Sequence, residues 1–277
     1  MKKRGLWFLV LVLTLALVTM GCGGGEKEKQ AANQEPAKQT EKNTLDQIKE
    51  KGVIVAGLDD TFAPMGYRDE SNKLVGFDID MGEEMAKRLG VKIQWQPTQW
   101  DGIIMALDSK RFDIILSGMT VTEERKKSIN FSVPYVGDGQ IMVVKKGTTG
   151  FNTAADLKGK VVGTQAGSSG EEAVKKVEGI KEVKLYKTYP EAFTDLQIGR
   201  IPVVVCDRIT ASHYISKRAD TYEIVGEKIT DEPLAIGLRK SDPELKEAID
   251  NVLNEMKKDG TLTKISMKWF NRDITVK

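Results

Sequence analysis

Arg125 is the side chain of this sequence best suited to hold a carboxylate. Its planar guanidinium presents parallel N–H donors that match the two oxygens of a carboxylate. It follows the apolar run 114–116 and the pair Ser117 and Gly118, so it should lie just beyond the carboxyl end of a buried strand. Open α/β sheets bind their ligands at that edge. The competing interpretation is a surface ion pair between Arg125 and a neighbouring glutamate.

A helix is expected to begin between this strand and Arg125. Ser117 and Gly118 are predicted to end the strand. Thr120, with a glutamate three residues later, has the spacing of a capping box, and Thr122 is an equally good N-cap. Either start leaves free backbone N–H groups near the guanidinium, and such a helix start favours an anion. Because a helix terminus contributes only about 0.3 to 1 kcal/mol, Arg125 should dominate carboxylate recognition.

Three other loops supply the remaining groups that a free amino acid would need. Loop 59–62 holds two aspartates and an aromatic residue, loop 165–170 holds small residues whose backbone can approach a ligand closely, and Asp207 ends an apolar run. All three follow predicted strands, so they should face one crevice together with Arg125. The set offers a cation for a carboxylate, an anion for an ammonium and an aromatic wall, which matches a free α-amino acid.

Each member of this set also has a simpler interpretation on its own. Phe62 and Trp100 belong to residue types found more often in a core than beside a ligand. Asp207 could cap the helix that follows it. Loop 167–170 matches neither a Walker pattern nor a dinucleotide fingerprint, so phosphate binding is disfavoured. The binding hypothesis therefore rests on the combination.

The elements that must position these residues alternate between strands and helices, which predicts parallel sheets in an α/β protein. One such set is followed by a second over residues 141–206, and a third segment returns after Pro233. The chain should therefore build one sheet, leave for a second and come back. The two crossings, near 135–139 and 230–233, would form a hinge.

Composition excludes several classes of function. The chain has 42 basic and 40 acidic residues and a formal net charge of +2, which argues against nucleic acid as a partner. His213 is the only histidine, so a His-based metal cluster is excluded and a Ser-His-Asp triad is disfavoured. We expect His213 on an exposed helix and Cys206 as a buried thiol. Neither a metal nor a cofactor is predicted.

The first 22 residues are predicted to be a targeting signal. Three basic residues precede the apolar run 6–18, which is too short and too early for a typical membrane span, and Gly21 and Cys22 follow. This resembles a bacterial lipoprotein signal, in which the cysteine becomes the lipidated first residue of the mature chain. Residues 23–44 are almost entirely polar and predict a flexible tether. An ordinary signal peptide or an uncleaved anchor is the alternative.

Several motifs carry a resemblance to a known family. They are GFDID at 76–80, SGMTVTEER at 117–125, and DGTL at 259–262 with KWF at 268–270. In combination they resemble the polar amino-acid substrate-binding proteins of bacterial ABC importers, and the similarity covers residues 45–277. The resemblance implies an α/β fold of two lobes joined by two hinge strands, the periplasmic-binding-protein or Venus-flytrap fold. Lobe 1 would comprise residues 45–138 and 232–277, and lobe 2 residues 139–231.

The resemblance also implies how the two charged groups of an amino acid would be held. Arg125 would bind the α-carboxylate, with help from Thr120 and Ser169. Asp207 and the backbone around Ser117 would bind the α-ammonium.

The resemblance further implies which residues would contact the ligand side chain. Phe62 and Trp100 would sandwich it, Asp59 would meet its polar end, and Gln165 would be another contact. The complete set of predicted ligand-binding residues is Asp59, Phe62, Trp100, Ser117, Gly118, Thr120, Arg125, Gln165, Ser169 and Asp207.

The function predicted from the sequence is capture of an amino acid outside the cytoplasm, without chemistry. A monomer anchored to the membrane through Cys22 would close on a polar amino acid and present it to an ABC permease and its ATPase. Asp59 and Asp60, near Phe62 and Trp100, favour a cationic ligand, arginine or lysine first and histidine next, with glutamine as the main competitor. Two other classes are a dehydratase or lyase on the same scaffold, which would need a proton donor in the cleft, and a sensory lobe. The sensory lobe is disfavoured because no second span or kinase-like extension follows before Lys277.

Overall fold

The computed structural model describes residues 42–276. The predicted targeting signal, with Cys22, and most of the predicted tether 23–44 lie outside these residues. Helix α1 (Thr44–Lys51) begins within the last residues assigned to the tether, and Asn43 caps it by accepting a hydrogen bond from the N–H of Asp46. None of the helices in the described part of the chain is long and apolar enough to cross a membrane.

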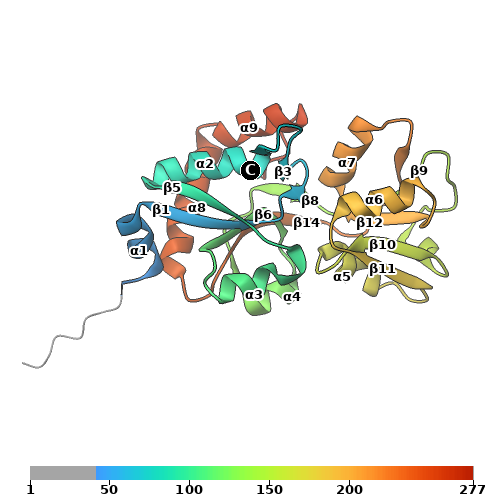
Figure 1. The fold of residues 1–277 in the computed structure, drawn as a ribbon, viewed down its shortest axis with the longest axis horizontal. Helices are drawn as coiled ribbons and strands as arrows, with labels where there is room; N and C mark the ends of the chain where they lie inside the picture. The colour runs from blue at the N-terminus through green and yellow to red at the C-terminus, as the bar shows by residue number, and fades with distance from the viewer. Residues whose placement is uncertain (1–41, 277) are drawn as a thin grey trace, which may run out of the picture. The chain divides into compact units, whose positions relative to one another are not determined.

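The first lobe is built on a mixed sheet in the order β5-β1-β6-β14-β7, with β8 also paired to β14 (Figure 1). Its strands are β1 (Val53–Leu58), β5 (Lys92–Pro97), β6 (Ile114–Thr120), β7 (Asn130–Phe131), β8 (Val136–Asp138) and β14 (Glu232–Leu238). Besides α1, its α-helices are α2 (Phe77–Leu89), α3 (Ile103–Asp108), α4 (Glu123–Ser128), α8 (Pro243–Lys258) and α9 (Thr261–Phe270). A small sheet of β2 (Thr61–Phe62), β3 (Gly66–Arg68) and β4 (Leu74–Val75) follows β1. As the alternation predicts, β1 is parallel to both β5 and β6.

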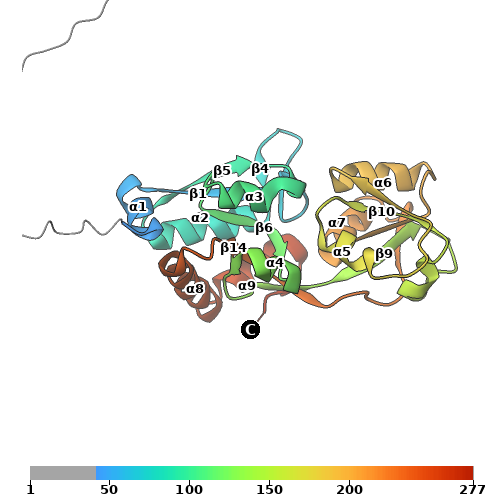
Figure 2. The same cartoon turned by 90° about the horizontal axis from the view of Figure 1, so that it is seen from below.

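The second lobe repeats this architecture with a sheet in the order β11-β10-β12-β9-β13. The strands are β9 (Gln140–Lys145), β10 (Val161–Gln165), β11 (Glu182–Tyr186), β12 (Val203–Asp207) and β13 (Tyr222–Val225). The helices are α5 (Ser169–Lys175), α6 (Tyr189–Gln197) and α7 (Arg208–Lys217). The two lobes are clearly distinct when the molecule is seen from below (Figure 2).

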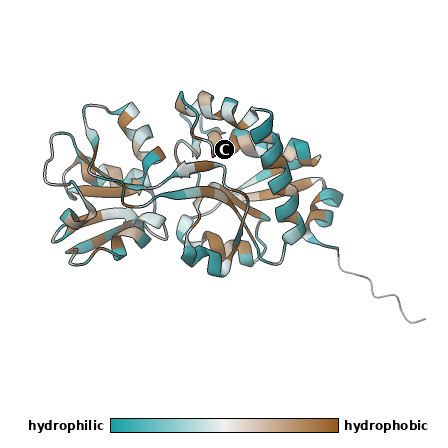
Figure 3. Cartoon of the chain, turned by 180° about the vertical axis from the view of Figure 1, so that it is seen from behind, coloured by the Kyte–Doolittle hydropathy of each residue, from teal (hydrophilic) through white to brown (hydrophobic). Residues whose placement is uncertain are grey.

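Successive side chains of the strands pack alternately into cores on the two faces of each sheet. In the first lobe Ile114 and Leu116 face the core beneath α2 and α8, whereas Ile115 faces the core beneath α3. The strands are largely hydrophobic, and hydrophilic residues gather on the outer turns of the helices (Figure 3). Helix α8 shows the reason. Its buried residues recur at steps of three and four on one face of an otherwise charged sequence, and they are Leu245, Ile249, Val252, Leu253 and Met256.

The chain crosses between the sheets twice, and the two crossings touch. It leaves β8 for β9 at Gly139 and returns from β13 to β14. The side chain of Thr230 accepts a hydrogen bond from the N–H of Gln140 at 3.0 Å. A Cβ at Gly139 would lie 2.0 Å from the Thr230 carbonyl oxygen, so only glycine allows this approach. The lobe boundaries predicted after residues 138 and 231 stay a prediction.

The predicted end of the central strand is wrong. Strand β6 continues through Ser117 and Gly118 to Thr120, because β14 pairs with it on both sides of a register shift. Helix α4 therefore starts later, and its N-cap is Thr122, whose hydroxyl accepts the Arg125 N–H at 3.2 Å. The alternative cap, Thr120, is a strand residue.

We expect Gly57→Ala to destabilise the first lobe. A Cβ at Gly57, in β1, would lie 2.5 Å from the buried ring of Phe112. Overpacking of this kind costs about 1 to 3 kcal/mol in free energy of unfolding. Urea denaturation followed by circular dichroism measures the loss. The matched control is Gly102→Ala, where an added Cβ meets nothing within 4 Å. Equal stability of the two variants would contradict the packing described here.

Candidate ligand-binding site

One internal cavity is lined by residues of both lobes. The first lobe contributes Phe62, Trp100, Ser117, Gly118 and Thr120, and the second contributes Gln165, Ser168, Ser169 and Asp207. All of these except Ser168 were predicted from the sequence as ligand-binding residues. The cavity has a volume of about 10 Å³, which is room for about one water molecule. An amino acid therefore fits only if the lobes move apart or the walls rearrange.

The cavity lies where strands end, as open sheets require. Strand β6 carries Ser117, Gly118 and Thr120 at its carboxyl end, β10 ends at Gln165, and β12 ends at Asp207. The N–H of Asp59, directly after β1, donates to the Ser117 hydroxyl at 3.0 Å. The local folding of the strands thus brings residues far apart in the sequence to one place.

Arg125 is buried beside the cavity and does not form a surface ion pair. It is 5 % exposed, and the neighbouring glutamates Glu123 and Glu124 pair with lysines instead. The interpretation of Arg125 as a solvated ion-pair residue is therefore wrong. Its guanidinium donates through Nη1 to the Thr120 carbonyl at 2.9 Å and through Nη2 to the Gly167 carbonyl of the other lobe at 3.0 Å.

The surroundings of Arg125 are partly apolar. Its guanidinium carbon lies 5.4 Å from the centre of the Trp100 ring. Its nearest carboxylate is that of Glu172, at 3.8 Å from Nε. Burial lowers the pKa of Arg125, and the negative charges of Glu172 and Asp207 oppose that shift. An arginine guanidinium stays charged in proteins. The donors of Arg125 are occupied by two carbonyl oxygens that an anion could replace.

Further hydrogen bonds join the two walls of the cavity. The hydroxyls of Thr120 and Ser169 are 3.0 Å apart. The indole N–H of Trp100 donates to the Gly167 carbonyl at 3.1 Å. Gly167 has a φ of +72° and would place a Cβ 3.0 Å from the Cα of Asp101, so glycine permits the lobes to meet here. Polar groups that could hold a ligand thus satisfy each other across the cleft.

Asp59 lies behind the cavity wall. Its Oδ1 accepts the N–H and the hydroxyl of Thr61 at 2.9 and 2.6 Å, and its Oδ2 accepts the Gln165 amide at 2.7 Å. Burial raises the pKa of Asp59, while these hydrogen bonds lower it. Gln165 therefore stands between the carboxylate and the cavity.

Asp207 has partners that the sequence did not indicate. Its Oδ1 accepts the Gln140 amide at 2.8 Å and its Oδ2 accepts the Tyr189 hydroxyl at 3.5 Å. Burial raises the pKa of Asp207 to about 6, although the Gln140 hydrogen bond and the charge of Arg125 lower it. Asp207 occupies the N-cap position of α7, as its alternative interpretation has it, but its side chain makes no capping hydrogen bond to the helix.

Gln140, Tyr189 and Ser168 are the residues around the cavity that sequence reasoning missed. Gln140 reaches Asp207 because β9 runs antiparallel to β12 and places the two residues opposite each other. Only knowledge of that pairing could have found it. The ring of Tyr189 lies 6.0 Å from that of Phe62, a contact between the lobes. Phe62 and Trp100 both line the cavity and both belong to hydrophobic cores, so neither interpretation excludes the other.

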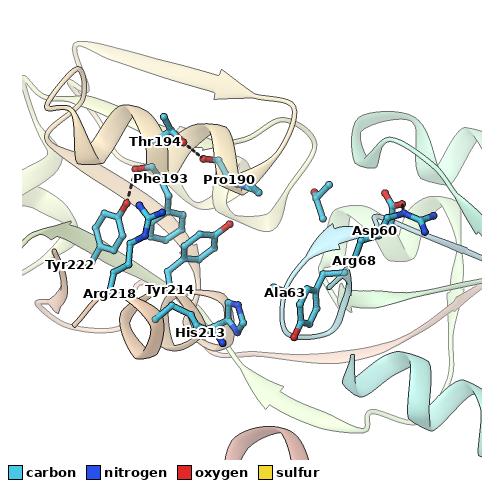
Figure 4. A pocket seen from close by; sticks show the side chains of 13 residues that line it. Asp60, Ala63, Arg68, Pro190, Phe193, Thr194, His213, Tyr214, Arg218 and Tyr222 are labelled. Atoms are coloured by element: carbon cyan, nitrogen blue, oxygen red, sulfur yellow. Dashed lines mark hydrogen bonds and ion pairs between the residues drawn. The ribbon is translucent and has the colours of Figure 1, made fainter. Parts of the chain in front are cut away.

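A wider groove of about 520 Å³ lies between the 60–68 loop of the first lobe and helices α6 and α7 of the second (Figure 4). His213 lines it, with its ring 5.5 Å from that of Tyr67 in the first lobe. Burial lowers the pKa of His213, and nearby Lys217 adds to that shift. The expectation that His213 is simply an exposed helix residue is therefore wrong. Cys206 is a buried free thiol, as expected.

Two lobes with mixed sheets, two crossings and a polar cavity between the lobes define a two-lobed binding protein. The chain belongs to the bacterial extracellular solute-binding proteins, family 3, whose model matches residues 54–272. The resemblance seen in the sequence and the predicted fold class are thereby confirmed.

Individual relatives are similar over most of the chain. The L-cystine-binding protein TcyJ of Escherichia coli (strain K12) is 39% identical over 233 residues, which cover 83% of this chain and 87% of the relative. The solved structure of an ancestral arginine-binding protein bound to arginine is 47% identical with a TM-score of 0.76, and the match covers 79% of this chain and 98% of that one. A second solved structure, bound to glutamine, is likewise described as an ancestral arginine-binding protein. An ancestral amino acid-binding protein described as a precursor of cyclohexadienyl dehydratase is 41% identical with a TM-score of 0.76, and the match covers 82% of this chain and 99% of that one.

We expect Gln165→Ala to shift the lobes apart. The substitution removes the hydrogen bond from Gln165 to the Asp59 carboxylate, and a bond to a charged group contributes about 1.5 to 3 kcal/mol. The population of separated lobes should rise at least tenfold. Pulsed electron paramagnetic resonance between labels at exposed Lys87 and Lys175, both replaced by cysteine, reports the distance.

The control for this measurement is Gln47→Ala, an exposed residue of α1 in the first lobe whose amide donates to the Lys42 carbonyl. Its distance distribution should match that of the wild type. A distribution for Gln165→Ala that also matches would mean that the contact does not hold the lobes together.

Proposed function

We propose that this chain is the extracytoplasmic binding component of an ABC importer and that it captures a polar amino acid by hinge closure. One observation carries the proposal. The buried carboxylate of Asp207, from the second lobe, lines the cavity. The buried guanidinium of Arg125, from the first lobe, lies beside the cavity and bonds to the carbonyl of Thr120, which lines it, and the charge of Arg125 lowers the pKa of Asp207. An α-amino acid presents the complementary pair of charges.

The carboxylate of the ligand would replace the Gly167 carbonyl as the acceptor of Arg125. The hydroxyls of Thr120 and Ser169 would turn from each other to the same carboxylate, and Asp207 with the backbone near Ser117 would take the ammonium. Charge-assisted hydrogen bonds contribute about 1.5 to 3 kcal/mol each, so two to four of them approach the roughly 8 kcal/mol of micromolar binding. The hydrogen bonds broken between the lobes reduce this sum.

The environment of the ligand side chain favours arginine first. We infer that Phe62 and Trp100 would flank the side chain and that its cationic end would reach Gln165 and the Asp59 carboxylate behind it. Lysine and histidine would follow. Glutamine is the competitor, because an amide can also donate to these acceptors, and the similar ancestral protein is described with either ligand. Cystine is a further candidate, since the similar TcyJ is named for it.

The hydrogen bonds of the two cavity carboxyls support binding over catalysis. A lyase or dehydratase would need one of them to move a proton to a substrate. Both oxygens of Asp59 and both oxygens of Asp207 accept hydrogen bonds, so the two carboxyls are placed as acceptors for a cationic group rather than as proton donors. We therefore propose that the protein performs no chemistry, although a similar ancestral protein is described as a precursor of an enzyme.

The remaining parts of the proposal concern location and partners. The targeting signal and Cys22 support anchoring to the outer face of the membrane by a lipid. Acyl chains contribute about 0.8 kcal/mol per buried methylene, so two or more chains would hold the protein stably. The protein would act as a monomer and deliver its ligand to a permease driven by an ATPase.

We expect Arg125→Ala to abolish ligand binding. Thermal unfolding of the chain from residue 23 onward, screened against the twenty amino acids and cystine, finds the ligand. A ligand at about one hundred times its dissociation constant adds roughly 2.7 kcal/mol of stability, which is a visible rise in melting temperature. The rise should vanish in Arg125→Ala and persist in Arg111→Ala, which removes an exposed arginine of the same lobe. A screen in which no compound raises the melting temperature would refute the amino-acid proposal.

We expect Asp59→Asn to weaken arginine binding at least tenfold more than glutamine binding. The substitution keeps the shape and removes a buried negative charge that only a cationic side chain needs. Isothermal titration calorimetry gives both dissociation constants. Asp60→Asn serves as the control, because Asp60 pairs with Arg68 outside the cavity. Equal losses for arginine and glutamine would exclude Asp59 as the source of a cationic preference.

A further inference from the structure

One buried acid of the first lobe takes no part in the contacts described so far. Asp78 lies in the first turn of α2, within motif 76–80, and its side chain is completely buried. The polar groups of the described chain that act on it are the Gly118 N–H and the Tyr135 hydroxyl, and no charged side chain does. A buried carboxyl without a cation is costly, so its position requires a physical explanation.

The first contact of Asp78 reaches the cavity. Its Oδ2 accepts the N–H of Gly118 at 2.6 Å. Gly118 lines the cavity and has a φ of +54°, and a Cβ at this position would lie 2.5 Å from the Phe62 ring. It lies in β6 where the pairing with β14 shifts register, between the paired residues Ile115 and Met119. The carboxyl of Asp78 thus provides an acceptor for a strand N–H at a ladder irregularity.

The second contact of Asp78 reaches the hinge. The hydroxyl of Tyr135 is close enough to lower the pKa of Asp78, yet neither this hydroxyl nor Oδ1 of Asp78 makes a hydrogen bond in this conformation. The ring of Tyr135 stacks on that of Phe77 at 6.0 Å. Tyr135 directly precedes β8, the strand that leads to the second lobe, and its N–H donates to Leu234 of the returning strand at 2.9 Å.

We propose that Asp78 is a positioning residue for ligand binding, which fixes the Gly118 backbone at the cavity and links it through Tyr135 to the hinge strand β8. The proposal rests on the proposed amino-acid-binding function. An ionised carboxyl holds the Gly118 N–H more strongly than a neutral one. The unbonded oxygen of Asp78 and the unbonded hydroxyl of Tyr135 are a matched acceptor and donor that a small shift of the hinge would join.

The burial of Asp78 makes the stability of the folded protein depend on pH. Burial raises the pKa of Asp78 from 3.8 to about 7, while the Gly118 N–H and the Tyr135 hydroxyl lower it. Because the folded state holds the proton more tightly than the unfolded state, this group's contribution to stability falls as pH rises from 3.8 to about 7 and stays low above that range. At pH 8 the Asp78→Asn variant should therefore have a melting temperature equal to or above that of the wild type.

The deciding variant is Asp78→Asn at pH 8, with arginine, glutamine and cystine as the probes. Its amide oxygen can still accept the Gly118 N–H, but as a neutral and weaker acceptor. We expect about tenfold weaker binding of whichever probe binds the wild type, without a lower melting temperature. The control is Asp113→Asn, because Asp113 likewise accepts a strand N–H, that of Val55 at 2.8 Å, away from the cavity. It should bind within twofold of the wild type.

A second readout requires no ligand. The amide resonance of Gly118 should titrate in the wild type with a midpoint near 7 and should not titrate in that range in Asp78→Asn. Tyr135→Phe should move the midpoint upward, since the hydroxyl lowers the pKa of Asp78. This readout also decides the question if Asp78→Asn fails to fold.

Three results would overturn the proposal. They are binding by Asp78→Asn within twofold of the wild type, a loss of affinity that only accompanies a lower melting temperature, and a Gly118 resonance that does not respond to Asp78 or Tyr135. A wild type that binds none of the probes would instead refute the proposed function, and the Gly118 titration would still test the link between Asp78 and the cavity.

Discussion

The need of buried polar groups for hydrogen-bond partners is the constraint on which this structure depends. Where the two lobes meet, Arg125, Thr120 and Asp59 of the first lobe find their partners in Gly167, Ser169 and Gln165 of the second. These contacts lie at the carboxyl ends of strands, so the sheets themselves bring them together. A molecule that enters the cavity breaks these hydrogen bonds, so it must provide new partners for the groups that formed them. A zwitterion does so, whereas an apolar molecule would leave the Arg125 guanidinium without the Gly167 carbonyl and the Asp59 carboxylate without the Gln165 amide.

A hinge at the two crossings would let this exchange of partners occur, as the proposed function requires. Each lobe keeps its own sheet, and the chain passes between them only through the paired crossings at Gly139 and Thr230. Apolar packing also joins the lobes, as the rings of Phe62 and Tyr189 show. Because both crossings run side by side, movement of one requires movement of the other. The polar contacts at the cavity would then determine the free energy of closure.

Much of this arrangement could be predicted from the sequence, because loops after strands of an α/β sheet converge on one edge. That rule brought Arg125, Asp207 and Gln165 together correctly. It failed where the outcome depends on pairing between distant segments. Strand β6 runs on past Gly118 because of β14, more than one hundred residues later, and Gln140 reaches Asp207 through antiparallel register. The partial burial of His213 follows from contact between the lobes, which no local pattern reveals.

The most direct measurement is a crystal structure of the chain from residue 23 onward grown with arginine. If the cavity is an amino-acid site, the guanidinium of Arg125 will hold the ligand carboxylate in place of the Gly167 carbonyl, and Asp207 will lie on the ligand ammonium. The hydroxyls of Thr120 and Ser169 will no longer bond to each other. Arginine bound elsewhere, or Arg125 still bonded to both carbonyl oxygens beside a bound ligand, would contradict this mechanism of recognition.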